Sequence, residues 1–307
     1  MKKVFLFISI FTFIFVLSAC EQTPENDRPI IPSKPVPDNT DTTYCEGQGY
    51  TYDYDSLVYD LVWNDEFDGD TLDLTKWTYE VNGSGGGNQE LQFYTNSNTS
   101  ITDGILSITA KYETYEGREY TSSRIVTNNK GQWTYGIFEA RIKLPGGLGS
   151  WPAFWMMPTT SRYGGWPDSG EIDIMEAVGY AENIVHGTIH TEAFNHTLGT
   201  QKGGTYYELT DAASEFHVYK VEWLPDRLKF YVDGINYFTY RPNAYSQCAT
   251  HEEWPFDANF FLILNVAVGG TWGGAQGVDP LDYPVSMEVD YVRVYQSETI
   301  TNIVQGE

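Results

Sequence analysis

The sequence predicts an all-β domain made of two packed antiparallel sheets. From Leu61 onward, short apolar-rich runs alternate with turn residues, and almost no segment has a helical pattern. Many short strands without helices are typical of sandwiches and barrels. Hydrophobic residues make up 41% of the 307 residues and aromatic residues 16%, so the chain can bury a sizeable core.

The strongest strand signals come from runs that alternate apolar and polar residues, as a half-buried sheet requires. In chain order, these runs are residues 105–111, which follow an Asp-Gly turn, and residues 135–144, 218–223, 227–232 and 287–295. Asp233-Gly234 follows the fourth run and predicts a tight hairpin. Residues 259–268 are nearly all apolar and predict a buried strand, whereas only the short stretch 208–215 looks helical.

The charge balance excludes several classes of partner. The chain carries 42 acidic and 18 basic residues, for a formal net charge of −24. Such a chain repels phosphate backbones and anionic lipid surfaces, so we expect no nucleic-acid partner. A neutral polymer, in contrast, needs no attraction between charges.

The N-terminus is typical of a targeting segment. Lys2 and Lys3 precede an apolar run that ends at Ala19 and is short for a membrane-spanning helix. Residues 1–19 therefore predict a secretory signal peptide. Residues 17–20 (LSAC) resemble the lipobox of bacterial lipoproteins, in which the chain is cut before the cysteine and its thiol is acylated. We expect lipidation at Cys20, and the alternative is an ordinary signal peptide with a chance cysteine.

The following segment, residues 20–57, has the composition of a flexible tether. It is acidic and proline-rich and shows no hydrophobic period. The folded domain is then expected over 58–297, and a C-terminal tail over 298–307. Cys45 and Cys248 can form one disulfide in an oxidising compartment or remain two free thiols.

Three carboxylates are concentrated in Glu171-Ile172-Asp173-Ile174-Met175-Glu176. Alternate side chains of a strand share a face, so Glu171 and Asp173 lie together. Glu176 joins them if a bulge at Ile174-Met175 inserts one extra residue. Three adjacent acids cannot all ionise cheaply, so at least one should keep its proton. Glycoside hydrolysis uses such a division into acid and base, and the alternative is a solvated strand face with ordinary acids.

Several segments together resemble glycoside hydrolase family 16, in its laminarinase-like (endo-β-1,3-glucanase) branch. The family's E-x-D-x-x-E signature stands at residues 171–176. The other matching segments are residues 88–94 (NQELQFY), 123–125 (SRI), 151–156 (WPAFWM), 166–170 (WPDSG), 263–270 (ILNVAVGG) and 289–295 (VDYVRVY). The resemblance covers about residues 60–296 in the expected order, and it implies a β-jelly-roll sandwich with a substrate groove across its concave sheet.

The resemblance also implies roles for the carboxylates and their neighbours. Glu171 corresponds to the nucleophile of a retaining mechanism, Glu176 to the acid/base, and Asp173 to a group that tunes the protonation of the pair. No cofactor is implied for catalysis. The substrate-binding positions that it implies are Asn88, Glu90, Arg124, Trp151, Trp155, Trp166, His190 and Trp272. Arg124 can equally form a structural ion pair, and the alternative for Trp151 and Trp155 is a place in the core.

The sequence contains two candidate metal sites. His186 and His190 are four residues apart, but the segment is strand-like and lacks the His-Glu-x-x-His pattern, so zinc is disfavoured and His186 is expected to be structural. Many family members carry one structural calcium ion. The resemblance places its ligands here at Glu66, the carbonyl of Gly104, and Asp290, and the alternative is that Glu66 and Asp290 are plain surface acids.

The sequence therefore predicts a lipid-anchored endo-β-1,3-glucanase that acts on laminarin-like glucan. Alternatives are a hydrolase of mixed-linkage β-1,3-1,4-glucan or of a galactan, and a non-catalytic surface glycan-binding lipoprotein. We expect a monomer in the cell envelope, anchored to the outer membrane and exposed at the surface.

Overall fold

The computed structural model describes residues 57–207, 209–244 and 249–305. Contacts divide the chain into two units, residues 1–40 and 41–307, and every described residue belongs to the second. The predicted signal peptide, Cys20, Cys45 and Cys248 lie outside the described residues, as does the tether except for Leu57. No helix in the described ranges is long and apolar enough to cross a membrane.

The larger of two sheets contains ten strands among the described residues. They are β1 Asp60–Asp65, β3 Gln92–Tyr94, β4 Thr99–Thr102, β5 Ile105–Tyr115, β6 Arg118–Ser122, β8 Gly136–Lys143, β13 His217–Leu224, β14 Arg227–Val232, β15 Ile235–Tyr240 and β17 Val285–Gln296. The spatial order is β15-β14-β13-β8-β17-β5-β6-β3, with β1 paired to β17 and β4 paired to β5.

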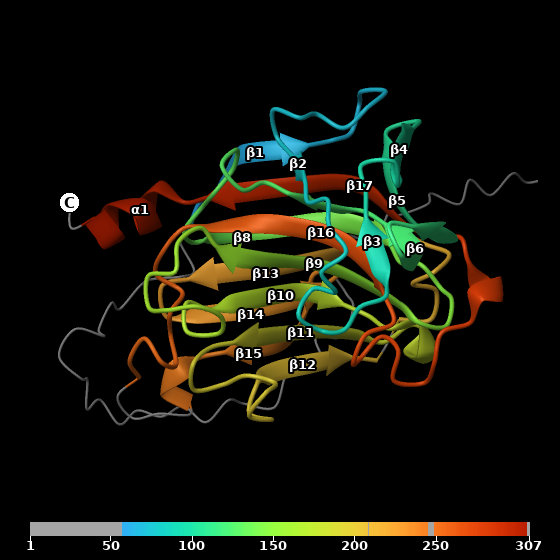
Figure 1. The fold of residues 1–307 in the computed structure, drawn as a ribbon. Helices are drawn as coiled ribbons and strands as arrows, with labels where there is room; N and C mark the ends of the chain where they lie inside the picture. Colours follow the sequence, from blue (N-terminus) through green and yellow to red (C-terminus); the bar gives the residue numbers. More distant parts are fainter. Residues whose placement is uncertain (1–56, 208, 245–248, 306–307) are drawn as a thin grey trace, which may run out of the picture. The chain divides into compact units, whose positions relative to one another are not determined.

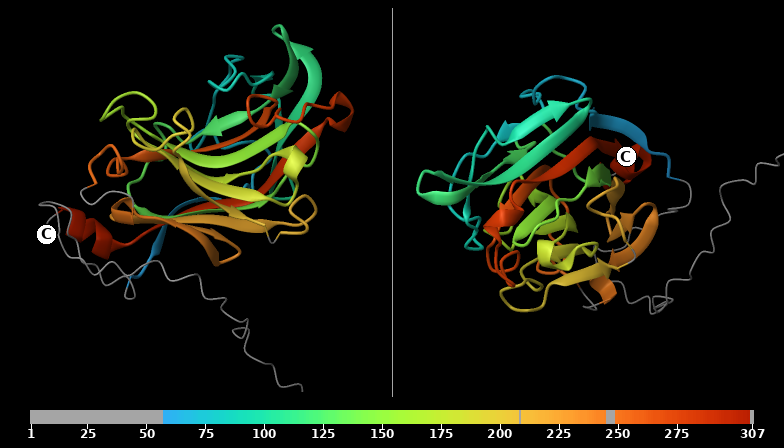
Figure 2. Two further views of the ribbon diagram at one scale, coloured as in Figure 1. Left: turned by 90° about the horizontal axis from the view of Figure 1, so that it is seen from below. Right: turned by 90° about the vertical axis from the view of Figure 1, so that its right-hand side faces the viewer.

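The smaller sheet contains seven strands. They are β2 Thr78–Tyr79, β7 Arg124–Val126, β9 Ser150–Pro158, β10 Glu171–Glu176, β11 Val185–His190, β12 Lys202–Tyr206 and β16 Phe260–Val268, in the spatial order β12-β11-β10-β9-β16-β7-β2. The two sheets lie face to face as separate layers (Figures 1 and 2). The prediction of two packed sheets is thus confirmed.

Burial follows the alternation in the sequence. Along β8, the residues at 136, 138, 140 and 142 are buried and those between them are half-buried. All nine residues of β16 are buried, because the strand lies between β9 and β7 and has its second face covered by Trp155, Val126 and Met157. Between the two sheets, one continuous core takes in Trp77, Trp223 and many aliphatic side chains.

The turns explain several strand junctions. Asp233 and Gly234, between β14 and β15, have φ values of 48° and 79°. Asp103 and Gly104, between β4 and β5, have 52° and 78°. Two consecutive residues with positive φ make the tight turn whose twist matches that of the flanking strands.

Three features depart from the sequence analysis. Strands β3 and β6 pair in parallel, although every other pair in the described sheets is antiparallel. No helix forms in the described residues 209–215: the amides of Ser214 and Glu215 both bond the carbonyl of Asp211, which closes a single turn. The segment expected to be a tail contains helix α1, Glu298–Gln305, whose Ile300 is buried in the core. The described residues also form three 3-10 helices, η2 Gly179–Ala181, η3 Pro242–Ala244 and η4 Pro280–Asp282.

Candidate active site

Strand β10 carries the three carboxylates to the side of the seven-stranded sheet that faces away from the core, here called the carboxylate face. The predicted bulge is present, because the pairing of β10 with β9 and β11 shifts register between Asp173 and Glu176. Ile172, Ile174 and Met175 join the core instead. The extra residue therefore brings Glu176 to the same face as Glu171 and Asp173.

Glu171 lies among three polar groups. The Trp166 indole N–H, from the loop between β9 and β10, donates to Glu171 Oε2 at 2.6 Å. Asp173 forms a hydrogen bond with Glu171. His190, the cross-strand neighbour of Glu171 on β11, places Nε2 3.4 Å from Asp173 Oδ2 and 4.0 Å from Glu171 Oε1.

Glu176 lies in a more aromatic environment. The Trp151 indole N–H, from β9, donates to Glu176 Oε1 at 3.0 Å. The Trp272 ring packs edge-on against Trp151 at 5.4 Å, and the His186 ring packs edge-on against Trp272 at 5.1 Å. His186 is also the cross-strand partner of Glu176. Each outer carboxylate thus accepts a hydrogen bond from its own tryptophan.

Burial and the charges of neighbouring groups give the three carboxyl groups different pKa values. Burial raises the pKa of Glu176 to about 8, the Trp151 hydrogen bond opposes the rise, and the charge of Glu171 adds to it. Burial and then the charges of Glu171 and Glu176 raise the pKa of Asp173 well above its usual range. Burial also raises the pKa of Glu171, but the hydrogen bonds from Asp173 and Trp166 and the charge of Arg124 lower it. The group most stabilised as an anion is therefore Glu171.

His190 is neutral in this setting. Burial, and to a lesser extent the charge of the nearby His196, lowers the pKa of its imidazole to about 4. At neutral pH the ring therefore acts as a hydrogen-bonding group beside Asp173 rather than as a cation.

Glu90 and Asn88 are held by a glycine-rich loop. The buried Glu90 carboxylate accepts hydrogen bonds from Gln92 at 2.7 Å and Tyr94 at 3.2 Å. Gly86 has φ +56°, and a Cβ there would lie 2.2 Å from Glu90 Oε1. Gly85 and Gly86 therefore let the backbone fold closely over Glu90.

Arg124 and Trp155 form the neighbouring part of the carboxylate face. The Arg124 guanidinium lies 4.7 Å from the Trp155 ring centroid, and its Nε is 2.8 Å from Glu80. The Trp155 indole N–H donates to Asn265 on β16 at 2.7 Å. Arg124 therefore forms a structural ion pair, which was one of its two predicted roles. Trp155 lies on the carboxylate face rather than in the main core.

His186 and His190 do not converge on a common metal position. Within the described ranges, the group of potential metal ligands that converges is Glu171, Asp173 and His190, with donor atoms within 4.8 Å of one another. His186 is not part of it, and its Nδ1 lies 3.1 Å from the Thr205 hydroxyl. Because Glu171 already bonds to both Asp173 and Trp166, the group fits acid–base chemistry.

The predicted calcium ligands have other partners. Both carboxylate oxygens of Glu66 accept from Arg293 at 2.8 Å. Asp290 Oδ2 accepts from Arg141 at 2.6 Å. Gly104 lies in the β4–β5 turn. Since arginines already neutralise both carboxylates, this arrangement does not fit a calcium ion held by Glu66, Gly104 and Asp290.

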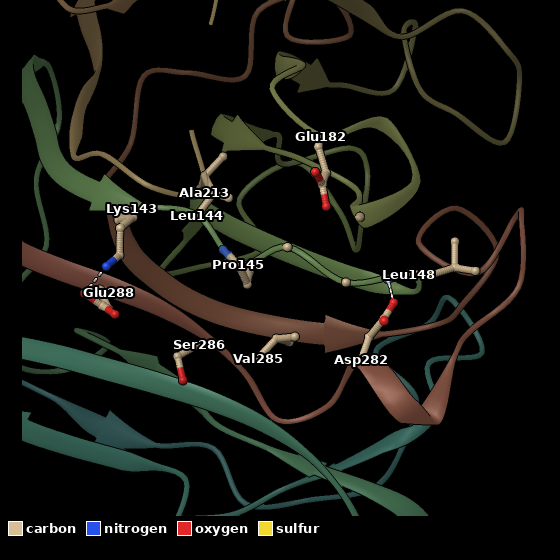
Figure 3. Close-up of a pocket in the computed structure, with 13 residues that line it drawn as sticks. Lys143, Leu144, Pro145, Leu148, Glu182, Ala213, Asp282, Val285, Ser286 and Glu288 are labelled. Atoms are coloured by element: carbon tan, nitrogen blue, oxygen red, sulfur yellow. Dashed lines mark hydrogen bonds and ion pairs between the residues drawn. The ribbon is translucent and has the colours of Figure 1, made fainter. Parts of the chain in front are cut away.

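A cavity of about 570 Å³ lies outside the carboxylate cluster (Figure 3). It is lined by the loop between β8 and β9, by the start of β17, and by Glu182 and Asp282. It contains the Lys143–Glu288 ion pair, and no residue in its lining is aromatic. It therefore lacks the ring faces expected of a sugar site.

The predicted site did not include three residues that lie next to it. Asn265 is the single polar residue in the apolar run of β16. Its polarity was a usable signal, because strand alternation places it on the carboxylate face. His186 was expected to be structural, but strand parity with His190 predicts its position beside Glu176. His196 lies in the β11–β12 loop and contacts Trp166, and nothing in the sequence pattern indicated it.

Comparisons with known proteins agree with this geometry. The family model for glycosyl hydrolases family 16 matches residues 85–293. A β-glucanase from Rhodothermus marinus is 52% identical over 245 residues, which cover 78% of this chain and 85% of that protein. The crystal structure of the laminarinase from Rhodothermus marinus has a TM-score of 0.77 and 51% identity, and the match covers 79% of this chain and 99% of that one. A non-specific endo-β-1,3(4)-glucanase has a TM-score of 0.73 and 44% identity over 78% of this chain and 92% of its own. With its two-sheet jelly-roll architecture and its carboxylate cluster, the chain belongs to glycosyl hydrolase family 16.

Proposed function

We propose that the protein is a retaining endo-β-1,3-glucanase that cleaves laminarin-like glucan. The observation that carries this proposal is the pairing of two carboxylates of unequal protonation on one strand face. Glu176, with a pKa of about 8, keeps its proton at neutral pH, whereas Glu171 receives hydrogen bonds that favour its anion. Hydrolases of this family need no catalytic cofactor.

The first step uses the two outer carboxylates together. Glu176 donates its proton to the glycosidic oxygen as the bond from that oxygen to the anomeric carbon breaks. The Glu171 carboxylate forms a new bond to the same carbon, which gives a covalent glycosyl-enzyme and releases the leaving sugar with its proton.

The second step restores the enzyme. Glu176, now a carboxylate, takes a proton from water, and the water oxygen bonds to the anomeric carbon as the bond to Glu171 breaks. Two displacements leave the anomeric configuration unchanged. Asp173 keeps its own proton throughout, because its raised pKa allows it to donate to Glu171.

A neutral sugar polymer fits the surroundings of the carboxylates. Trp166 remains 40% exposed while its N–H bonds Glu171, so its ring is open to a sugar face. Trp151 and Trp272 provide further rings next to Glu176. Aromatic faces stack on sugar rings without attraction between charges, in keeping with the net charge of −24.

Reducing-sugar release from laminarin, lichenan, agarose and carrageenan tests the proposal. We expect hydrolysis of laminarin with retention of configuration at the new reducing end, observed by NMR. Activity on agarose or carrageenan alone would show that the substrate is a galactan and not β-1,3-glucan. Absence of hydrolysis with retained laminarin binding would support the non-catalytic alternative. Glu171 and Glu176 are both present, which favours catalysis.

Mixed-linkage β-1,3-1,4-glucan is a second candidate substrate. The similarity to a non-specific endo-β-1,3(4)-glucanase favours it. Cleavage of lichenan at a rate comparable with laminarin would extend the proposed specificity to both linkages.

We also propose that the protein is a monomeric lipoprotein of the cell envelope, anchored through Cys20 to the outer membrane and exposed at the surface. The support is the basic and apolar sequence before Cys20 and the size of a polymeric substrate, which favours an outward-facing enzyme. Replacement of Cys20 by Ala should abolish incorporation of labelled fatty acid and release the protein from the membrane fraction. Surface proteolysis of whole cells tests exposure, and light scattering tests the oligomeric state.

A further inference from the structure

We propose that His196 is a positioning residue that holds the Trp166 indole against Glu171. The proposal rests on the proposed function, because it assigns a role to His196 in the same reaction. His196 acts through Trp166, whose N–H donates to the nucleophile.

Three rings contact one another beside Glu171. The centroid of the His196 ring lies 4.9 Å from that of Trp166 and 5.1 Å from that of His190. Trp166 and His190 are themselves 5.8 Å apart. His196 therefore contacts both the side chain that bonds Glu171 and the one beside Asp173.

Trp166 needs an external support. It lies in the loop between β9 and β10, and 40% of it is exposed. An exposed side chain on a loop loses rotamer entropy when it keeps one orientation. A ring packed against its indole restricts that freedom.

The loop that carries His196 is itself held rigidly. The preceding residue, Asn195, is only 2% exposed. Its amide nitrogen donates to the carbonyls of Thr191 and Glu192 at 3.2 and 3.1 Å. Its amide oxygen accepts from Thr197 Oγ1 at 2.5 Å and Leu198 N at 3.2 Å. The backbone is thus fixed on both sides of His196, as a support for another side chain requires.

The expected effect on Glu171 follows from its hydrogen bonds. The Trp166 N–H lowers the pKa of the carboxyl, as do Asp173 and Arg124. His190 also faces it at 4.0 Å, and the charge of Glu171 in turn raises the pKa of Glu176. If Trp166 leaves its position, the anion loses one donor and the pKa of Glu171 rises. The acidic limb of the kcat/KM profile should then move to higher pH.

The primary test compares His196→Ala with His196→Phe on laminarin. We expect H196A to lower kcat about 2- to 10-fold, with the acidic limb moved upward and KM changed less than about 2-fold. H196F keeps a ring against Trp166 and should retain both kcat and the pH profile. The matched control is His251→Ala, because His251 stacks on Tyr163 of the same loop at 4.7 Å rather than on Trp166. Thermal melts of all variants establish that each is folded.

A double-mutant cycle with Trp166→Phe tests the route. If His196 acts through the indole N–H, adding H196A to W166F should cause no further loss of kcat. An equal loss in both backgrounds, a change confined to KM, or an H196F variant as impaired as H196A would each overturn the proposal.

A readout without substrate separates this proposal from the proposed function. The indole N–H resonance of Trp166 can be identified as the one missing from W166F. We expect it to exchange with solvent faster in H196A than in wild type, and unchanged exchange would contradict the positioning role. A wild-type protein that fails to hydrolyse laminarin would instead contradict the proposed function.

Discussion

Trp151 donates its indole N–H to Glu176 at 3.0 Å from the neighbouring strand of the same sheet. This contact opposes the rise in the pKa of Glu176 that burial causes. The acid/base is therefore tuned by a residue that also offers a ring face to the substrate.

Replacement of Trp151 by Phe should make Glu176 a weaker acid. Loss of the donor removes a contribution that lowers the pKa, so the basic limb of the kcat/KM profile should move upward by about one pH unit. The matched control is Trp155→Phe, since Trp155 donates to Asn265 instead. A basic limb that moves equally in both variants would show that the smaller ring, and not the lost hydrogen bond to Glu176, is responsible.

Replacement of Glu171 by Gln should abolish hydrolysis and leave the fold intact. The amide cannot form the covalent intermediate, so we expect kcat to fall at least about 10³-fold, as when a nucleophile is removed. Azide should rescue Glu171→Gly, because it attacks the anomeric carbon in place of the missing carboxylate and inverts the configuration there. A Glu176→Gly variant keeps the Glu171 nucleophile, so azide should not rescue it by this inverting displacement. Near-normal turnover by E171Q would rule out the assignment.

Stability should fall with rising pH because of Glu176. In the folded state its pKa is about 8, against an ordinary value of 4.5, so between these values the folded state holds more protons than the unfolded state. Stability contributed by this group is complete below about pH 4.5 and is lost as pH rises toward 8. Glu176→Gln cannot ionise, so its Tm relative to wild type should increase by about 2–4 °C or more between pH 5 and pH 8.5. A constant difference in Tm between the two proteins would contradict the raised pKa.

Replacement of Gly86 by Ala should disturb Glu90. Its Cβ would lie 2.2 Å from Glu90 Oε1, so the carboxylate must move and kcat/KM should fall together with Tm. Gly87→Ala is the matched control, because that position also has positive φ but has nothing within 4 Å of the added carbon. G87A should show only the backbone cost of about 1–2 kcal/mol. Equal losses of activity in G86A and G87A would show that closeness to Glu90 is unimportant.

Chelation should leave stability unchanged. Arg293 and Arg141 occupy the carboxylates of Glu66 and Asp290, so we expect EDTA to move Tm by less than about 1 °C. A melt that drops in EDTA and recovers with calcium would show that these arginines give way to a cation.

The sequence predicts the strands well, and it also predicts that the three carboxylates share one face of their strand. Both features depend on local periodicity. Alternation alone places residues 106, 108 and 110 in the core and predicts the bulge that brings Glu176 beside Glu171. The chemistry of three neighbouring acids then restricts what the strand can do. Local pattern is sufficient here because each of these features lies within one strand.

The remaining features depend on which segments meet in space. The parallel pairing of β3 with β6 joins chain segments that hairpin rules do not connect. Arg293 and Arg141 reach Glu66 and Asp290 across neighbouring strands, and that register is set by the whole sheet. His196 reaches Trp166 from a separate loop, and no spacing in the sequence relates the two.

The bulge in β10 makes the site depend on the number of residues in the strand more than on their identity. Ile174 and Met175 need only be apolar, so exchanges between aliphatic side chains preserve the face on which Glu176 lies. Deletion or insertion of one residue there would instead turn the acid/base into the core and present an aliphatic side chain to the sugar. This strand should therefore tolerate exchanges among apolar side chains at Ile172, Ile174 and Met175 while rejecting any change in length.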